Sequence, residues 1–92
     1  MSRIKSPSYL KKIRLLACLI CTNPYVEVHH LMEAEPSAMS MKSGDNWAVP
    51  LCSRHHRELH DIGDEKAFFA KHGFRWDRIM SYAADLWKKY QN

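Results

Sequence analysis

A ten-residue stretch in the middle of the chain, residues 51–60, is unusually rich in potential metal ligands. It reads LCSRHHRELH, and if it is helical, His56 and His60 lie one turn apart on one face, because side chains four positions apart are neighbours on a helix. Cys52 and His55, three positions apart at its start, then point in another direction. One short helix could therefore supply ligands to two different metal centres.

The length and the cysteines limit how such a chain can be stabilised. The chain has 92 residues, and residues 1–92 are expected to form one domain. In a domain of this size the hydrophobic core alone gives little stability. The N-terminus leads into a mixed basic and apolar segment rather than a secretory signal, and no segment approaches the length of a membrane span. We therefore expect the reducing cytoplasm and no membrane contact. In that compartment Cys18, Cys21 and Cys52 more often bind metal than form disulfides.

The charge balance favours a polyanionic partner. Lysine and arginine outnumber aspartate and glutamate by 14 to 10, which gives a formal net charge of +4 and a pI near 9.1. Such a basic surface attracts nucleic acid by general electrostatics, although many small basic proteins bind none. The most basic part is expected to be a free arm at 1–7 followed by an N-terminal helix at 8–17, capped by Ser8.

Hydrophobic periodicity predicts the remaining elements. Residues 26–31 alternate apolar and polar side chains and are typical of a strand. A long loop follows, and then a second strand that should end at Pro50, where proline cannot donate to a ladder. The elements expected, in order, are a strand at 26–31, a loop at 32–45, a strand at 46–50, a helix at 51–62, and two helices within 64–90, the first capped by Asp64.

A Cys-x-x-Cys pair at Cys18 and Cys21 precedes the first strand. This spacing can close around one zinc ion, or it can be a redox pair. The redox interpretation needs a thioredoxin-like order of strands and helices, which this chain does not show, so metal is favoured. Adding Cys52 and His55 completes a tetrahedral set of three thiolates and one imidazole, the composition of a structural zinc site.

The remaining histidines allow a second site. His56 and His60 could share one ion with a histidine of the first strand, where alternation places His29 and His30 on opposite faces. Three protein ligands with an open position are typical of a catalytic metal. The histidine left over would be free to accept a proton from water. We expect Glu58 to be solvated and His72 to be a helix-terminal residue without chemistry.

The order of these motifs resembles the HNH nucleases of the ββα-metal fold. The shared features are His29-His30, a strand ending in Val-Pro-Leu-Cys at 49–52, and His-His-Arg-Glu-Leu-His at 55–60. The chain is similar in particular to the small phage-associated branch that includes the recombination-enhancement nucleases. That branch also has a zinc-knuckle Cys-x-x-Cys, an extended loop after His-His, and a Gly-Asp-Glu/Phe-Phe stretch after the helix. The likeness covers about 18–87.

The resemblance implies a role for each matching residue. His29 would join His56 and His60 in holding the catalytic ion, and His30 would be the general base. The family's middle asparagine is assigned to Asn46, one residue before its usual position, with Asp45 as an alternative. The implied fold is α+β: a ββα-metal core with a structural zinc site at 18–62, flanked by an N-terminal helix and two C-terminal helices.

The resemblance implies that the protein is a metal-dependent DNA endonuclease that leaves a 5′ phosphate. Its cofactors would be a structural zinc ion and a divalent cation, Mn, Mg, Ni or Zn, of which Mg suits imidazole ligands least. The resemblance also implies a phage or host recombination or packaging protein as a partner. The chief alternative is a non-catalytic zinc module that binds DNA or a protein. A third possibility is a small interaction protein that docks through its aromatic C-terminal helix.

Overall fold

An antiparallel β-hairpin lies at the centre of the fold. The computed structural model describes residues 3–35 and 43–91, and in it β1 (Val26–His30) pairs with β2 (Ala48–Cys52). The register places Val26 opposite Cys52 and His30 opposite Ala48. This register brings the Cys52 end of β2 to the start of β1, which directly follows the Cys-x-x-Cys turn.

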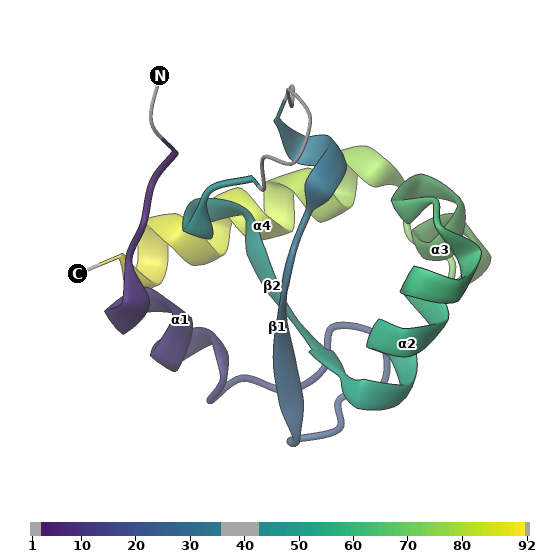
Figure 1. Ribbon diagram of the computed structural model, residues 1–92, viewed down its shortest axis with the longest axis horizontal. Helices are drawn as coiled ribbons and strands as arrows, with labels where there is room; N and C mark the ends of the chain where they lie inside the picture. The colour runs from purple at the N-terminus through teal and green to yellow at the C-terminus, as the bar shows by residue number, and fades with distance from the viewer. Residues whose placement is uncertain (1–2, 36–42, 92) are drawn as a thin grey trace.

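Helices surround the hairpin, as Figure 1 shows: α1 lies on one side, α2 and α3 on the other, and α4 runs across behind. The fold class is confirmed as a small α+β domain with a hairpin, its following helix, one N-terminal helix and two C-terminal helices. The helix bounds are α1 (Pro7–Ile13), α2 (Ser53–Ile62), α3 (Glu65–Lys71) and α4 (Trp76–Tyr90), with single 3-10 turns at Met32–Ala34 and Asp45–Trp47.

The core forms where α2, α3 and α4 pack on β2. Every residue of β2 is buried, and Phe68 and Phe69 of α3 pack edge to face with ring centroids 5.0 Å apart. Ile79 and Ala83 of α4 complete this cluster, which also contains Cys18 and Cys52. Because both cysteines belong to the core, a metal held there would join the knuckle, the hairpin and α2. Within the described residues, no helix is long and apolar enough to cross a membrane.

The second strand differs from its predicted bounds of 46–50. The structure has a 3-10 turn at Asp45–Trp47 and a strand at Ala48–Cys52, so Pro50 lies inside the strand rather than at its end. Proline is tolerated here because its backbone faces away from β1: the Pro50 carbonyl accepts the amide of Leu19 at 3.0 Å. The predicted loop at 32–45 contains the 3-10 turn Met32–Ala34, and its residues 36–42 lie outside the described residues.

The N-terminal segment also corrects the sequence prediction. Residues 3–6 are not a free arm, because the amide of Asp45 donates to the Ile4 carbonyl at 2.8 Å and the amide of Ser6 donates to Asp45 Oδ2 at 2.7 Å. The helix runs over Pro7–Ile13 instead of 8–17, and Ser8 is not its cap. Pro7 sets the first helical position, where proline's fixed φ and missing N–H suit a helix start.

The predicted end of α2 and the predicted cap of α3 are confirmed, whereas α2 begins at Ser53, two residues later than predicted. Gly63 ends α2 in the left-handed region with φ 74°, a conformation that glycine adopts without steric cost. The next residue, Asp64, caps α3 by accepting the Ala67 amide at 3.0 Å. This short connection turns α3 back over α2, and it places Glu65 beside the first histidine of β1.

Candidate metal centre

The first ligand cluster combines the Cys-x-x-Cys turn with the start of α2. Sulfur atoms of Cys21 and Cys52 lie 3.7 Å apart, and Nδ1 of His55 lies 3.2 Å from Cys52 Sγ and 3.9 Å from Cys18 Sγ. A tetrahedral zinc ion at ordinary bond lengths sets S···S edges of about 3.8 Å and S···N edges of about 3.6 Å. The cluster of Cys18, Cys21, Cys52 and His55 therefore fits a structural zinc site.

The backbone of the knuckle supports this chemistry. The Cys18 amide donates to the Asn23 carbonyl at 2.8 Å, and the Thr22 amide donates to the Cys18 carbonyl at 2.9 Å. Burial raises the pKa of the Cys18 thiol, but backbone amides of Cys52, Cys21 and Ile20 outweigh it, so that the net pKa is lowered. A lowered pKa favours the thiolate, which is the form that binds metal.

The second cluster contains three imidazoles. His29 comes from β1, and His56 and His60 lie one turn apart on α2, as the sequence predicted. Nδ1 of His29 and Nε2 of His60 each lie 3.2 Å from Nε2 of His56. Three nitrogens around a tetrahedral zinc ion would be separated by about 3.3–3.4 Å. The spacing thus matches that of ligands around one cation.

Two carboxylates determine which ring nitrogens face inward. Glu65 Oε2 lies 2.5 Å from Nε2 of His29, and Glu27 Oε1 lies 2.8 Å from Nδ1 of His56. A carboxylate can only accept, so each neutral ring carries its hydrogen on that side. The two nitrogens that face each other at 3.2 Å then both present lone pairs. Only a proton or a cation between them relieves that repulsion, and the third nitrogen, from His60, favours a metal ion.

His30 lies beside this cluster but is held differently. It lines a cavity of about 200 Å³ together with the three candidate ligands His29, His56 and His60. Its Nε2 is 2.8 Å from Asp45 Oδ1. Burial raises the pKa of Asp45, but hydrogen bonds from the Ser6 amide and from His30 outweigh it, so that the net pKa is lowered. An ionised Asp45 places the hydrogen of neutral His30 on Nε2 and leaves Nδ1 able to accept a proton.

Asp45, not Asn46, provides the hydrogen bond to His30 among the described residues. Asn46 follows in the same 3-10 turn and is half-buried. The Asn46 side chain lies close to Gly44, because a Cβ added at Gly44 would come within 2.6 Å of Asn46 Oδ1. The alternative assignment to Asp45 therefore has the direct contact, while the predicted role of Asn46 stays a prediction.

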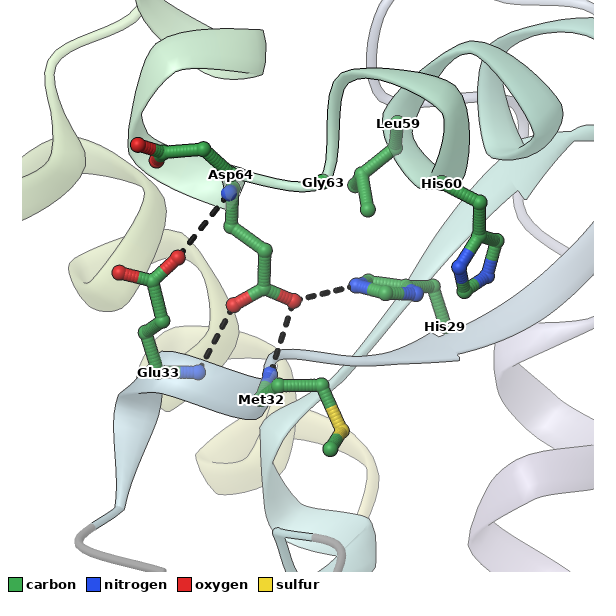
Figure 2. Close-up of a pocket in the computed structure, with 8 residues that line it drawn as sticks. His29, Met32, Glu33, Leu59, His60, Gly63 and Asp64 are labelled. Atoms are coloured by element: carbon green, nitrogen blue, oxygen red, sulfur yellow. Dashed lines mark hydrogen bonds and ion pairs between the residues drawn. The ribbon is translucent and has the colours of Figure 1, made fainter.

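A second cavity shares His29, Met32 and His60 with the first. It has a volume of about 460 Å³, and Figure 2 shows His29 and His60 on one side of it and Glu33 and Asp64 on the other. The Glu65 carboxylate lies in its wall and accepts the amides of Met32 and Glu33, both at 2.8 Å. These bonds anchor the 3-10 turn after β1 to the start of α3.

The structure corrects the prediction for Glu58, whereas His72 lies at the C-terminal end of α3, as predicted. Glu58 is not simply solvated, because it pairs with Lys71 and, at 2.9 Å, with Nε2 of His72. Its hydrogen bonds with Lys71 and His72 lower the pKa of Glu58 to about 2. The His72 ring packs edge to face on His55, with centroids 5.1 Å apart. These side chains therefore brace the imidazole of the Cys3His cluster.

Sequence reasoning missed two carboxylates that contact the histidines, Glu27 and Glu65, and named Asp45 only as an alternative to Asn46. Glu27 has a local signal, because it lies two positions before His29 and strand alternation puts it on the same face. Glu65 has none, since it belongs to a different helix, 36 residues after His29. Contacts of this kind depend on how α3 folds back.

Together, the fold and its two ligand clusters define a small α+β domain with a Cys3His group and a three-histidine group around one hairpin and helix. The chain belongs to the family described as "Protein of unknown function (DUF968)", whose model matches residues 1–86. It is similar to the uncharacterized protein YdfU of Escherichia coli (strain K12), with 32% identity over 74 residues, 80% of this chain and 21% of YdfU. The chain thus spans about a fifth of that relative's length. No solved structure matches it.

Proposed function

We propose that this protein is a metal-dependent DNA endonuclease of the HNH type. The observation that carries the proposal is the convergence of nitrogens from His29, His56 and His60, with His30 lining the same cavity. Three neutral ligands leave coordination positions open for water and substrate, as in catalytic metal sites. The family description assigns no activity, so the proposal depends on this geometry and on the resemblance of the motifs.

The phosphodiester would be hydrolysed with His30 as general base. Nδ1 of His30 takes a proton from water, the water oxygen forms a bond to phosphorus, and the bond from phosphorus to the 3′ oxygen breaks. The 3′ oxygen leaves with a proton from solvent, which gives a 5′ phosphate and a 3′ hydroxyl. Asp45 holds the His30 ring so that Nδ1 is the free nitrogen. A bound divalent cation would stabilise the negative charge on the phosphate and the leaving oxygen.

An arginine and an exposed aromatic ring lie beside this centre, where they could contact a nucleic acid. Arg14, Tyr25, Glu27 and Ser53 line a cavity of about 350 Å³, and Glu27 is the carboxylate that holds His56. Arg14 is exposed, and Tyr25 is 84% exposed. An arginine can neutralise a backbone phosphate, and an exposed aromatic ring can stack on an unpaired base. DNA is therefore the proposed substrate.

The test is cleavage of supercoiled plasmid and of single-stranded DNA by zinc-loaded protein with added Mn, Mg, Ni or Zn. Wild type should cut with at least one cation, and His30→Ala should cut about 10²- to 10⁴-fold more slowly, the usual contribution of a general base. Asp61→Ala is a matched control on an exposed position of α2 next to His60 and should cut normally.

Two outcomes would overturn the proposal. If His30→Ala cuts as fast as wild type, His30 is not the base. If wild type retains DNA on a gel but cuts with none of the four cations, the protein is a non-catalytic zinc module that binds DNA.

A further inference from the structure

A buried carboxylate lies behind the three-histidine cluster. Glu65 is the first residue of α3 and is only 4% exposed, yet it lies 2.5 Å from the far nitrogen of His29. We infer that Glu65 is a positioning residue that holds His29 in the orientation and tautomer in which Nδ1 faces the ion. This inference rests on the metal centre of the proposed function, but it does not depend on whether DNA is cut.

The hydrogen bonds to Glu65 leave it little freedom. Oε2 faces His29 and also accepts the Met32 amide at 2.8 Å, and Oε1 accepts the Glu33 amide at 2.8 Å. Three donors converge on one carboxylate, which compensates the loss of water around a buried charge. The two backbone amides can only donate, so both oxygens of Glu65 act as acceptors.

A reciprocal bond fixes the carboxylate in place. Glu33 Oε2 accepts the backbone amide of Glu65 at 3.0 Å, while Glu65 accepts the amide of Glu33. Figure 2 shows this pair of bonds linking the turn that carries Met32 and Glu33 to the start of α3, with His29 beside it. The position of the His29 ring is thus tied to the docking of α3.

The metal centre depends on which of the two ring nitrogens of His29 carries the hydrogen. If Glu65 did not take the hydrogen at Nε2, neutral His29 could carry it on Nδ1, where it would block the ion. Partners of this kind commonly change metal affinity by about 10- to 100-fold when they are removed. Glu65 therefore selects the metal-binding tautomer before any ion arrives.

The informative substitution is Glu65→Gln, which keeps the shape of the side chain. The side-chain amide introduced by this substitution would place its NH2 group against a donor in either orientation. In one orientation that donor is the backbone amide of Glu33, and in the other the donors are His29 and the backbone amide of Met32. A donor facing a donor cannot form a hydrogen bond, so the substitution weakens the hold on His29 or on the turn after β1. Glu33→Gln is the matched control, because it removes a nearby charge and keeps an oxygen for the Glu65 amide, without touching His29.

Two readouts test the inference on protein loaded with one equivalent of zinc, which fills the Cys3His cluster and leaves the three-histidine cluster free of metal. Calorimetric titration with Mn or Ni should show an affinity at least about 10-fold weaker in Glu65→Gln and changed less than about 3-fold in Glu33→Gln. Nitrogen NMR of the ring, before the second ion is added, should show His29 protonated at Nε2 in wild type. Equal losses of affinity in both variants, or a wild-type His29 protonated at Nδ1, would overturn the inference that Glu65 positions His29. If both readouts succeed and DNA is not cut, the positioning role stands and the nuclease proposal fails.

Discussion

At the scale of single residues, Asp45 leads to a prediction about the general base. Because Asp45 accepts the hydrogen of His30, Asp45→Asn should lower kcat for DNA cleavage by about 10-fold or more with little change in KM, within the range expected for disturbing a general base. Asn46→Ala should lower kcat less. Steady-state cleavage by both variants, with melting curves to check folding, measures kcat and KM. A larger loss of kcat in Asn46→Ala would return the positioning role to Asn46.

The ligand types could be predicted from the sequence, but not the side chains that orient them. The Cys-x-x-Cys spacing and the i, i+4 pair on a short helix indicated the two clusters, and the family resemblance selected His29 from the His29-His30 pair. The carboxylates Glu27, Asp45 and Glu65 contact the histidines from three different segments. Such contacts arise from tertiary folding, so spacing along the chain could not predict Glu65 or decide between Asp45 and Asn46.

At the scale of elements, the sequence located the four α-helices and both strands of the described residues, but not the two 3-10 turns, and the ends of the elements depended on tertiary contacts. The second strand was placed two residues early, because Trp47 at the end of the turn Asp45–Trp47 adjoins the apolar residues of β2 and Pro50 was taken as a stop. The first helix was drawn too long, because the Leu15 and Leu16 amides form tighter i to i−3 bonds. That turn lets the chain reach Cys18 and the zinc knuckle.

The packing of α1 on α4 leads to a second prediction. Tyr9 meets Trp87 edge to face, with ring centroids 4.8 Å apart, and burial, followed by the charge of Tyr82, raises the pKa of Tyr9 to about 12. Its buried hydroxyl has no hydrogen-bond partner among the described residues. Tyr9→Phe should therefore leave stability unchanged or raise it by up to about 1 kcal/mol, whereas Tyr9→Ala should cost about 3–5 kcal/mol. Urea unfolding checks both, and a clear loss of stability in Tyr9→Phe would contradict this assignment.

At the scale of the whole molecule, folding and metal binding should share one pH dependence. Burial lowers the pKa of His29 and of His55 below the ordinary histidine value of 6.5. The unfolded chain then binds protons more readily than the folded protein, so stability falls as the pH drops below about 6.5 toward the lower folded values. Protons also compete with the ion for imidazole, which acts in the same direction.

The direction of this change of stability with pH can be measured with zinc-loaded protein. The urea midpoint should be lower at pH 5.5 than at pH 7.5, because His29 and His55 must both take up protons on unfolding. His29→Asn, which cannot titrate, should lose less between the two pH values. Equal losses in the variant and in wild type would show that His29 contributes nothing to the pH dependence.

The central claim is that three imidazoles converge on a cation independently of the Cys3His cluster. Its most direct test is the metal content of protein equilibrated with zinc and freed of loosely bound ions. Wild type should retain two equivalents, and the double variant His56→Ala/His60→Ala should retain one, because its Cys3His cluster is intact. A single equivalent in wild type, or two in the double variant, would contradict the account.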